Sequence, residues 1–218
     1  MIQMLNLILG LILSYLIGSI PTAFIFAKVL KGLDIRTFGS GNVGATNALR
    51  LLGKKTGLAV LLIDILKGLI CVTFLVDALP AGKFIYFKDV LLLRFYFGIL
   101  AIMGHSFSVF LRFKGGKGVA TSLGVLLGMG LVSQPMGMVL GFTILVWLIT
   151  FIITRYVSLA SILAAGCFPL GVFFWGRNLS IFMLSLGLGA FIIFKHKSNI
   201  IRLLRREETR LDIFGRKP

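Results

Sequence analysis

Long apolar segments recur along the chain and are separated by short polar connections. They cover residues 5–30, 57–79, 90–113, 118–132, 136–153, 156–175 and 178–194. Most of these segments reach about 18 residues, which is enough for a helix to cross the hydrocarbon core of a bilayer. The pattern predicts an all-α integral membrane protein, built as a bundle of about seven transmembrane helices.

Two segments need a separate interpretation. The first lacks the basic start and the small-residue cleavage site of a signal peptide, so it is expected to remain as a spanning helix. The fourth is short and holds Gly124 and Gly128 four residues apart, a spacing that allows close approach of a neighbouring helix. A re-entrant segment is the alternative at this position.

Composition supports the membrane assignment. Hydrophobic residues make up 58% of the 218 residues, and the mean hydropathy is +1.02, well above the values of soluble domains. Cys71 and Cys167 lie in apolar segments without metal-ligand spacing, so both are interpreted as packing residues. We expect one polytopic domain over residues 1–218, with a basic cytoplasmic tail from about residue 195.

The basic residues predict the orientation in the membrane. Eighteen of the 23 Lys and Arg residues fall in alternate connections and in the tail: Lys28, Lys31, Arg36, Arg50, Lys54, Lys55, Arg112, Lys114, Lys117, Arg155, Lys195, Lys197, Arg202, Arg205, Arg206, Arg210, Arg216 and Lys217. The opposite side holds only Lys83, Lys88, Arg94 and Arg177. The positive-inside bias therefore places the amino terminus outside and the carboxyl terminus in the cytoplasm. Topology and attraction to anionic membrane lipids explain the net charge of +16, so no nucleic-acid partner is expected.

A glycine-rich stretch over residues 38–50 is the first candidate site. Gly39, Gly41 and Gly44 match a dinucleotide-binding spacing, but a spanning segment precedes them where that motif needs a strand. Small residues of this kind can still form a nest of backbone N–H groups for an anion. Further donors in the stretch are Ser40, Asn42, Thr46, Asn47 and Arg50. A flexible interhelical loop is the alternative.

A second polar stretch begins with His105 at the end of the third segment. It continues into a tight basic turn made of Lys114, Gly115, Gly116, Lys117 and Gly118. A Walker loop is excluded because Gly118 replaces the Ser or Thr that would follow the lysine. His105 has no carboxylate nearby in the sequence, so a structural role is the alternative to a catalytic one unless a partner arrives from elsewhere in the fold.

Two more polar stretches lie near the cytoplasmic ends of later segments. Ser158 and Ser161 share one helix face, where packing and substrate contact are equally open. His196, Asn199 and Arg202 recur every three residues, and a charged tail follows that we interpret mainly as solvated or lipid-adsorbing. Within the second segment, Asp64 and Lys67 stand at helix spacing and are expected to form a structural ion pair.

Taken together, these stretches resemble the bacterial acyl-phosphate:glycerol-3-phosphate acyltransferase family over nearly the whole chain. The resemblance rests on residues 18–21, residues 40–47 with Arg50, Asp64, residues 67–68, residues 104–118, and the pattern of His196, Asn199 and Arg202. One departure is Arg206, two residues before Glu208, in a tail where the family commonly has a glycine before its acidic position. The resemblance implies a membrane bundle of about seven helices whose active site faces the cytoplasm of a bacterial inner membrane.

The resemblance also implies a reaction and its residues. An acyl group moves from acyl phosphate to glycerol 3-phosphate and gives lysophosphatidic acid, without a cofactor, a metal or a covalent enzyme intermediate. The implied catalytic residues are Ser40, Asn42, Arg50, Lys117, His196 and Asn199. The implied substrate-binding residues are Gly39, Gly41, Gly44, Thr46, Asn47, His105, Lys114, Gly115, Gly116, Gly118, Ser158, Ser161 and Glu208. The alternatives are a transporter of an anionic metabolite and a purely structural membrane protein; clustering of the candidate ligands at one face disfavours a transporter.

Overall fold

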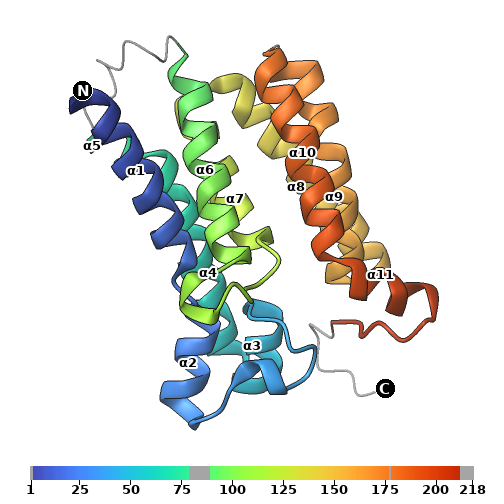
Figure 1. The fold of residues 1–218 in the computed structure, drawn as a ribbon. Helices are drawn as coiled ribbons and strands as arrows, with labels where there is room; N and C mark the ends of the chain where they lie inside the picture. Colours follow the sequence, from blue (N-terminus) through green and yellow to red (C-terminus); the bar gives the residue numbers. More distant parts are fainter. Residues whose placement is uncertain (1, 79–88, 177, 212–218) are drawn as a thin grey trace. The chain divides into compact units, whose positions relative to one another are not determined.

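The computed structural model of this chain describes residues 2–78, 89–176 and 178–211, and every regular element in these ranges is a helix (Figure 1). The chain divides into two compact units, Met1–Ser133 and Gln134–Pro218. The first unit contains α1 (Ile2–Ser19), α2 (Thr22–Lys31), η1 (Ile35–Thr37), α3 (Ala45–Leu52), α4 (Lys54–Val72), α5 (Phe74–Ala78), α6 (Val90–Ser106), η3 (Val109–Leu111) and α7 (Val119–Val132). The second contains α8 (Gln134–Thr154), α9 (Val157–Gly171), η4 (Val172–Gly176), α10 (Leu179–Lys195) and α11 (Lys197–Leu204).

The helices follow the apolar segments of the sequence closely. Four described helical stretches are long and apolar enough to cross a membrane: Lys54–Ala78, Val90–Leu111, Gln134–Thr154 and Val157–Gly176. Two bent pairs of helices raise this number to six if each pair counts as one span. The apolar helix α7, with 14 residues, is shorter than a usual span. The protein is therefore an all-helical membrane protein in its described residues, and the count of about seven crossings stays a prediction.

The first apolar segment differs from the expected single helix. Helix α1 ends at Ser19, helix α2 starts at Thr22, and their axes differ by 40°. Pro21 lies between them and causes the break, because proline has no N–H to donate and disfavours the helical conformation of the residue before it.

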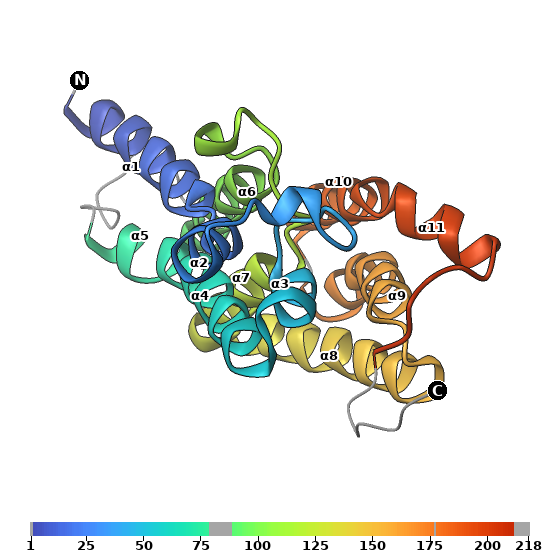
Figure 2. The same ribbon diagram turned by 90° about the horizontal axis from the view of Figure 1, so that it is seen from below.

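In the first unit, α4 packs along α7, and α1 packs along α6, as Figure 2 also shows. Glycines let α4 and α7 approach backbone to backbone. A Cβ atom added to Gly124 would overlap the carbonyl oxygen of Ile65, and one added to Gly68 would overlap the carbonyl oxygen of Thr121. The expectation that the glycines of residues 118–132 permit close approach is confirmed.

In the second unit, α9 packs against both α8 and α10. Helices α10 and α11 meet at His196 with a bend of 58°. The chain then turns back, and the backbone N–H of Leu211 donates to the carbonyl oxygen of Arg155 at 2.9 Å. The guanidinium of Arg210 lies 5.2 Å from the ring centre of Tyr156. Residues 210–211 thus contact the chain just before α9, while Arg205, Arg206, Glu207, Thr209 and Arg210 remain exposed, in agreement with the interpretation of the tail as mainly solvated.

Arg94 lies within α6, inside the apolar segment predicted over residues 90–113. Its side chain is buried, forms an ion pair with Asp77 and donates to the carbonyl oxygen of Val72 at 2.6 Å. Burial with two partners explains how a cation sits near the end of an apolar helix. The other basic residues assigned to that side, Lys83, Lys88 and Arg177, lie outside the described residues, as do Arg216 and Lys217.

Candidate functional site

The glycine-rich stretch forms a loop between η1 and α3. Gly39 and Gly41 have φ angles of +55° and +67°, a region that glycine enters at little cost. The N–H of Gly41 donates to the carbonyl oxygen of Phe38 at 2.9 Å and closes a tight turn. Ser40 is exposed, and its hydroxyl accepts a bond from the N–H of Asn42 at 3.4 Å. The loop therefore presents a polar, small-residue backbone at its surface.

Asn47 holds this loop together from inside. Its side chain is 2% exposed, and its amide nitrogen donates to the carbonyl oxygens of Ile35 and Phe38 at 3.2 and 3.0 Å. Its amide oxygen lies 3.3 Å from the N–H of Ser40. Because both amide hydrogens serve the loop, the structure gives Asn47 a supporting position rather than the ligand donor expected from the sequence. On the same helix α3, Thr46 is half-buried and Arg50 is exposed in the last turn.

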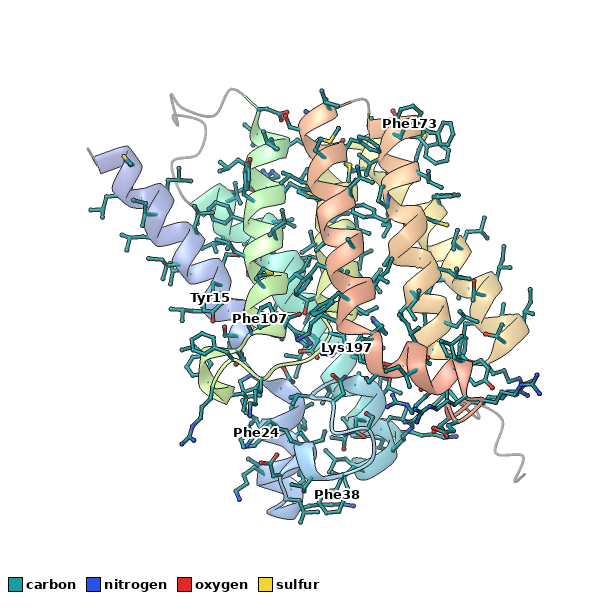
Figure 3. The ribbon with its side chains drawn as sticks, turned by 45° about the vertical axis from the view of Figure 1, so that its right-hand side comes forward. Tyr15, Phe24, Phe38, Phe107, Phe173 and Lys197 are labelled. Carbon is teal, nitrogen blue, oxygen red and sulfur yellow. The ribbon has the colours of Figure 1, made fainter. Side chains whose placement is uncertain are left out.

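The second basic stretch forms a loop that is anchored on α1 and α6. Tyr15 of α1 donates to the carbonyl oxygen of Phe107 at 2.6 Å, and both side chains are labelled in Figure 3. The hydroxyl of Ser108 donates to the carbonyl oxygen of Ser19 at 2.5 Å. Gly118 has a φ of +84° and ends the loop at the start of α7. These bonds fix the path of the chain that carries Lys114 and Lys117.

The two glycine-rich loops meet at Gly116. Its N–H donates to the carbonyl oxygen of His105 at 3.0 Å. A Cβ atom at Gly116 would overlap Nε2 of His105 and would lie 2.7 Å from the carbonyl oxygen of Val43, in the first loop. Only a glycine fits this junction. The structure therefore brings the loop of residues 38–44, His105 and the turn that carries Lys117 together, while Lys117 itself is half-buried and Lys114 is exposed.

A buried polar cluster lies behind the junction. Lys67 Nζ is 2.8 Å from Asp64 Oδ1, so the expected ion pair within α4 is confirmed. Thr22 donates to the same oxygen at 3.0 Å. His105 Nδ1 lies 2.8 Å from Lys67 Nζ and 3.8 Å from Asp64 Oδ1. The partner that His105 lacks locally in the sequence thus comes from α4.

In the second unit, Glu208 gathers the polar residues predicted on α9 and α11. Ser158 and Asn199 donate to its Oε1 at 2.8 and 2.7 Å, and Arg202 Nε donates to Oε2 at 2.7 Å. Burial raises the pKa of Glu208, but the hydrogen bonds from Arg202, Asn199 and Ser158 outweigh it and hold that pKa below its ordinary value. Both oxygens of Glu208, which the sequence suggested as a substrate contact, thus accept hydrogen bonds from other residues of the protein.

His196 and Ser161 have well-defined partners of their own. His196 is 2% exposed, and its Nδ1 lies 2.8 Å from the carbonyl oxygen of Ile192. Because a carbonyl only accepts, Nδ1 carries the hydrogen, and in the neutral ring Nε2 holds the lone pair. Ser161 donates to the carbonyl oxygen of Val157 at 2.7 Å and accepts from Trp147 at 3.3 Å. The packing interpretation of Ser161 thus has direct structural support.

Arg206 has a conformation that the sequence alone does not reveal. It has a φ of +60° directly after the end of α11. The N–H of Arg206 donates to the carbonyl oxygen of Leu203 at 3.1 Å, and that of Glu207 donates to the carbonyl oxygen of Arg202 at 2.8 Å. This pair of bonds is a Schellman helix end, which favours glycine at the left-handed position. The departure noted at Arg206 in the sequence therefore falls on the one backbone position of this turn that prefers glycine.

Across the described ranges, no three His, Cys, Asp or Glu side chains come together in a way that could hold a metal ion. The donors in both units are instead amides, hydroxyls, an imidazole and cationic groups. Such groups bind anions, and phosphate above all.

Comparison with known proteins agrees with this chemistry. The family model described as glycerol-3-phosphate acyltransferase matches residues 8–206. The glycerol-3-phosphate acyltransferase of Chlorobium chlorochromatii is 42% identical, with 98% of this chain and all of the relative aligned. That of Fusobacterium nucleatum is 41% identical over 92% of this chain and 95% of the relative.

Two solved structures of the integral membrane glycerol 3-phosphate acyltransferase PlsY (YgiH) are also similar. The glycerol 3-phosphate form has a TM-score of 0.80 at 40% identity and covers 94% of this chain and 96% of its own. The lysophosphatidic acid form has a TM-score of 0.78. The chain belongs to the glycerol-3-phosphate acyltransferase family.

Proposed function

We propose that this enzyme transfers a fatty acyl group from acyl phosphate to glycerol 3-phosphate and forms lysophosphatidic acid and inorganic phosphate. The observation that carries the proposal is the junction at Gly116, where a glycine-rich loop meets the turn that bears Lys117. A cation beside a loop of small polar residues suits a phosphorylated substrate. The solved forms of PlsY with glycerol 3-phosphate and lysophosphatidic acid support the acceptor and the product.

In this reaction a hydroxyl oxygen of glycerol 3-phosphate attacks the acyl carbonyl carbon. A new C–O ester bond forms, the bond between that carbon and the phosphate oxygen breaks, and the hydroxyl proton passes to a phosphate oxygen. Phosphate is a good leaving group, so a strong protein base is not needed. The contribution of the enzyme is then positioning and charge neutralisation, which can supply about 7 to 11 kcal/mol.

Roles follow for the residues of each unit. In the first unit, Ser40 and Asn42 with the glycines of their loop bind the acyl phosphate, and Arg50 and Lys117 neutralise phosphate charge. In the second unit, His196 and Asn199 bind glycerol 3-phosphate. Glu208 fixes the amide of Asn199 through the bond of 2.7 Å. Ser161 contributes through helix packing.

The placement in the membrane is part of the proposal. We infer a bacterial inner membrane protein of about seven crossings, with the amino terminus outside and the active site and carboxyl terminus at the cytoplasmic face. The alternation of basic connections supports this orientation. We also propose that residues 1–218 act as one catalytic domain, because the family match over residues 8–206 includes parts of both units.

Donor choice tests the proposed reaction. Purified protein in lipid-supplemented detergent is given glycerol 3-phosphate together with either acyl phosphate or acyl-CoA, and lysophosphatidic acid is measured. We expect efficient product formation from acyl phosphate and little from acyl-CoA, because the loops carry no nucleotide-binding fingerprint. Efficient turnover of acyl-CoA would contradict the donor assignment, and absence of product from both donors would contradict the acyl transfer itself.

A further inference from the structure

We propose that Lys67 is a positioning residue that fixes the tautomer of His105, and through that ring the junction of the two glycine-rich loops. The inference rests on the proposed function only in assigning substrate binding to these loops. Its structural part concerns Asp64, Lys67, His105 and the contact at Gly116, all within the first unit.

The hydrogen bonds of Lys67 fill its capacity as an ammonium group. An ammonium has three hydrogens and no lone pair. Its nitrogen lies 2.8 Å from Asp64 Oδ1, 3.2 Å from the carbonyl oxygen of Ile20 and 2.8 Å from His105 Nδ1. Three hydrogens therefore meet three acceptors. The side chains of Lys67 and Asp64 are only 5% and 2% exposed, so this arrangement satisfies a charge that would otherwise be costly within a spanning segment.

The state of the His105 ring follows from these bonds. A charged Lys67 can only donate, so His105 Nδ1 must accept. The ring is then neutral, and its single hydrogen is on Nε2. Aspartate alone would not impose this state, because a carboxylate beside Nδ1 favours a hydrogen on that atom, and Asp64 Oδ1 is 3.8 Å away. Lys67, rather than Asp64, selects the tautomer.

The selected Nε2–H faces the junction of the loops. A Cβ atom added to Gly116 would lie 2.2 Å from Nε2 and 2.7 Å from the carbonyl oxygen of Val43, so both atoms lie on the same side of Gly116. The carbonyl oxygen of His105 accepts from the N–H of Gly116 at 3.0 Å. His105 thus contacts the Lys117 turn through its backbone and its ring. The protonation of Nε2 matters at this place, because backbone carbonyl oxygens attract a ring N–H and repel a ring lone pair.

The tautomers can be read directly by NMR. The chain has two histidines, and the structure assigns them opposite tautomers, Nε2–H for His105 and Nδ1–H for His196. With 15N-labelled histidine, the wild type should show one ring of each kind. In Lys67→Met, the His105 signals should move to the Nδ1–H form or to a mixture, while the His196 signals stay.

Arg94→Met is the matched control. It also removes a buried cation that pairs with a carboxylate and a backbone carbonyl in the first unit. Arg94 lies 11 residues before His105 on α6, about 16 Å away along the helix. The Arg94→Met variant should have a lower unfolding temperature than wild type, with the tautomers of His105 and His196 unchanged. A wild-type His105 with hydrogen on Nδ1, or His105 signals unchanged in Lys67→Met, would overturn the proposal.

Kinetics separate positioning from general stability. Asp64→Leu/Lys67→Met replaces the ion pair by apolar side chains, a change that often preserves or improves stability. This double variant should unfold at or above the wild-type temperature, yet kcat/KM for glycerol 3-phosphate should fall about tenfold to a hundredfold, as a small misplacement of a binding group can cause. Wild-type kinetics in the stable double variant would refute the positioning role. If Lys67→Met does not fold, the NMR comparison is made on this double variant. Because the tautomer measurement needs no substrate, it stands even if the proposed reaction fails.

Discussion

At the scale of single residues, the carboxylate of Glu208 accepts hydrogen bonds from Ser158, Asn199 and Arg202 in the second unit. Its pKa is held below the ordinary value, since three hydrogen bonds outweigh the effect of burial. A group whose pKa is lowered by folding stabilises the fold above its unfolded pKa, and this contribution is lost as the pH falls through the folded pKa. Glu208→Gln should therefore cost about 1 to 3 kcal/mol at neutral pH. Thermal unfolding measured below about pH 4.3 should show this difference from wild type shrinking.

Glu207→Gln is the control for this prediction, because it makes the same charge change on the exposed neighbouring residue. It should leave the unfolding temperature close to that of wild type at each pH. Equal effects of the two substitutions would show that net charge, and not the bonds to Ser158, Asn199 and Arg202, accounts for the change.

His196 allows binding and proton transfer to be distinguished. Its hydrogen is on Nδ1, facing Ile192, so Nε2 is the nitrogen with a lone pair in the neutral ring. If His196 serves only to bind phosphate, His196→Gln should retain appreciable turnover at saturating glycerol 3-phosphate, with its main defect in KM. The measurement is kcat and KM across pH. Complete loss of kcat in a folded variant, together with loss of a rate pKa near about 6 to 7, would make His196 the general base.

Residue roles were predictable where the partners are close in sequence. The Asp64–Lys67 pair follows from helix spacing, and so does the shared face of Asn199 and Arg202. The contact between Lys67 and His105 spans 38 residues, and no local pattern reports which helices pack together. The inward position of Asn47 was hidden for a related reason, because an amide that supports a loop has the same sequence signature as one that binds a ligand.

At the scale of elements, the end of α11 carries backbone strain at Arg206. A left-handed conformation costs a non-glycine residue about 1 to 2 kcal/mol, whereas glycine in an ordinary position costs about 0.5 to 1 kcal/mol in entropy. Arg206→Gly should therefore raise the unfolding temperature. Arg205→Gly, at the preceding position with a φ of −83°, should lower it. Thermal unfolding of the two variants in the same detergent makes the comparison, and a loss of stability in both would contradict the assigned helix end.

The apolar segments predicted the element positions well, because a run of apolar residues in lipid must satisfy its backbone hydrogen bonds as helix. Breaks within a segment were harder to foresee. Ile20 and Pro21 interrupt the first helix within a segment that stays apolar on both sides, and the helix axis bends by 58° at His196. The ion pair between Arg94 and Asp77 was also hidden, because Asp77 lies on α5, in a different apolar segment from Arg94.

At the scale of the whole molecule, the distribution of basic residues predicts which ends face the cytoplasm. Single cysteines at Gln134 and Ser198, both exposed, report on the two sides when Cys71 and Cys167 are replaced. A membrane-impermeant reagent added to intact cells should modify Gln134→Cys and leave Ser198→Cys unmodified until the membrane is opened. Labelling of the Gln134 position only from the cytoplasm would contradict the orientation, since residues 133–135 carry no positive charge to hold them inside.

The most direct test of the proposed reaction is its stoichiometry in purified protein. With acyl phosphate and labelled glycerol 3-phosphate, each lysophosphatidic acid formed should be matched by one inorganic phosphate released. Arg50→Ala and Lys117→Ala, which would remove the proposed charge-assisted contacts to phosphate, should each lower kcat/KM by roughly tenfold to a hundredfold. Phosphate release without acylated product, or product formation that is unaffected by both substitutions, would contradict the account.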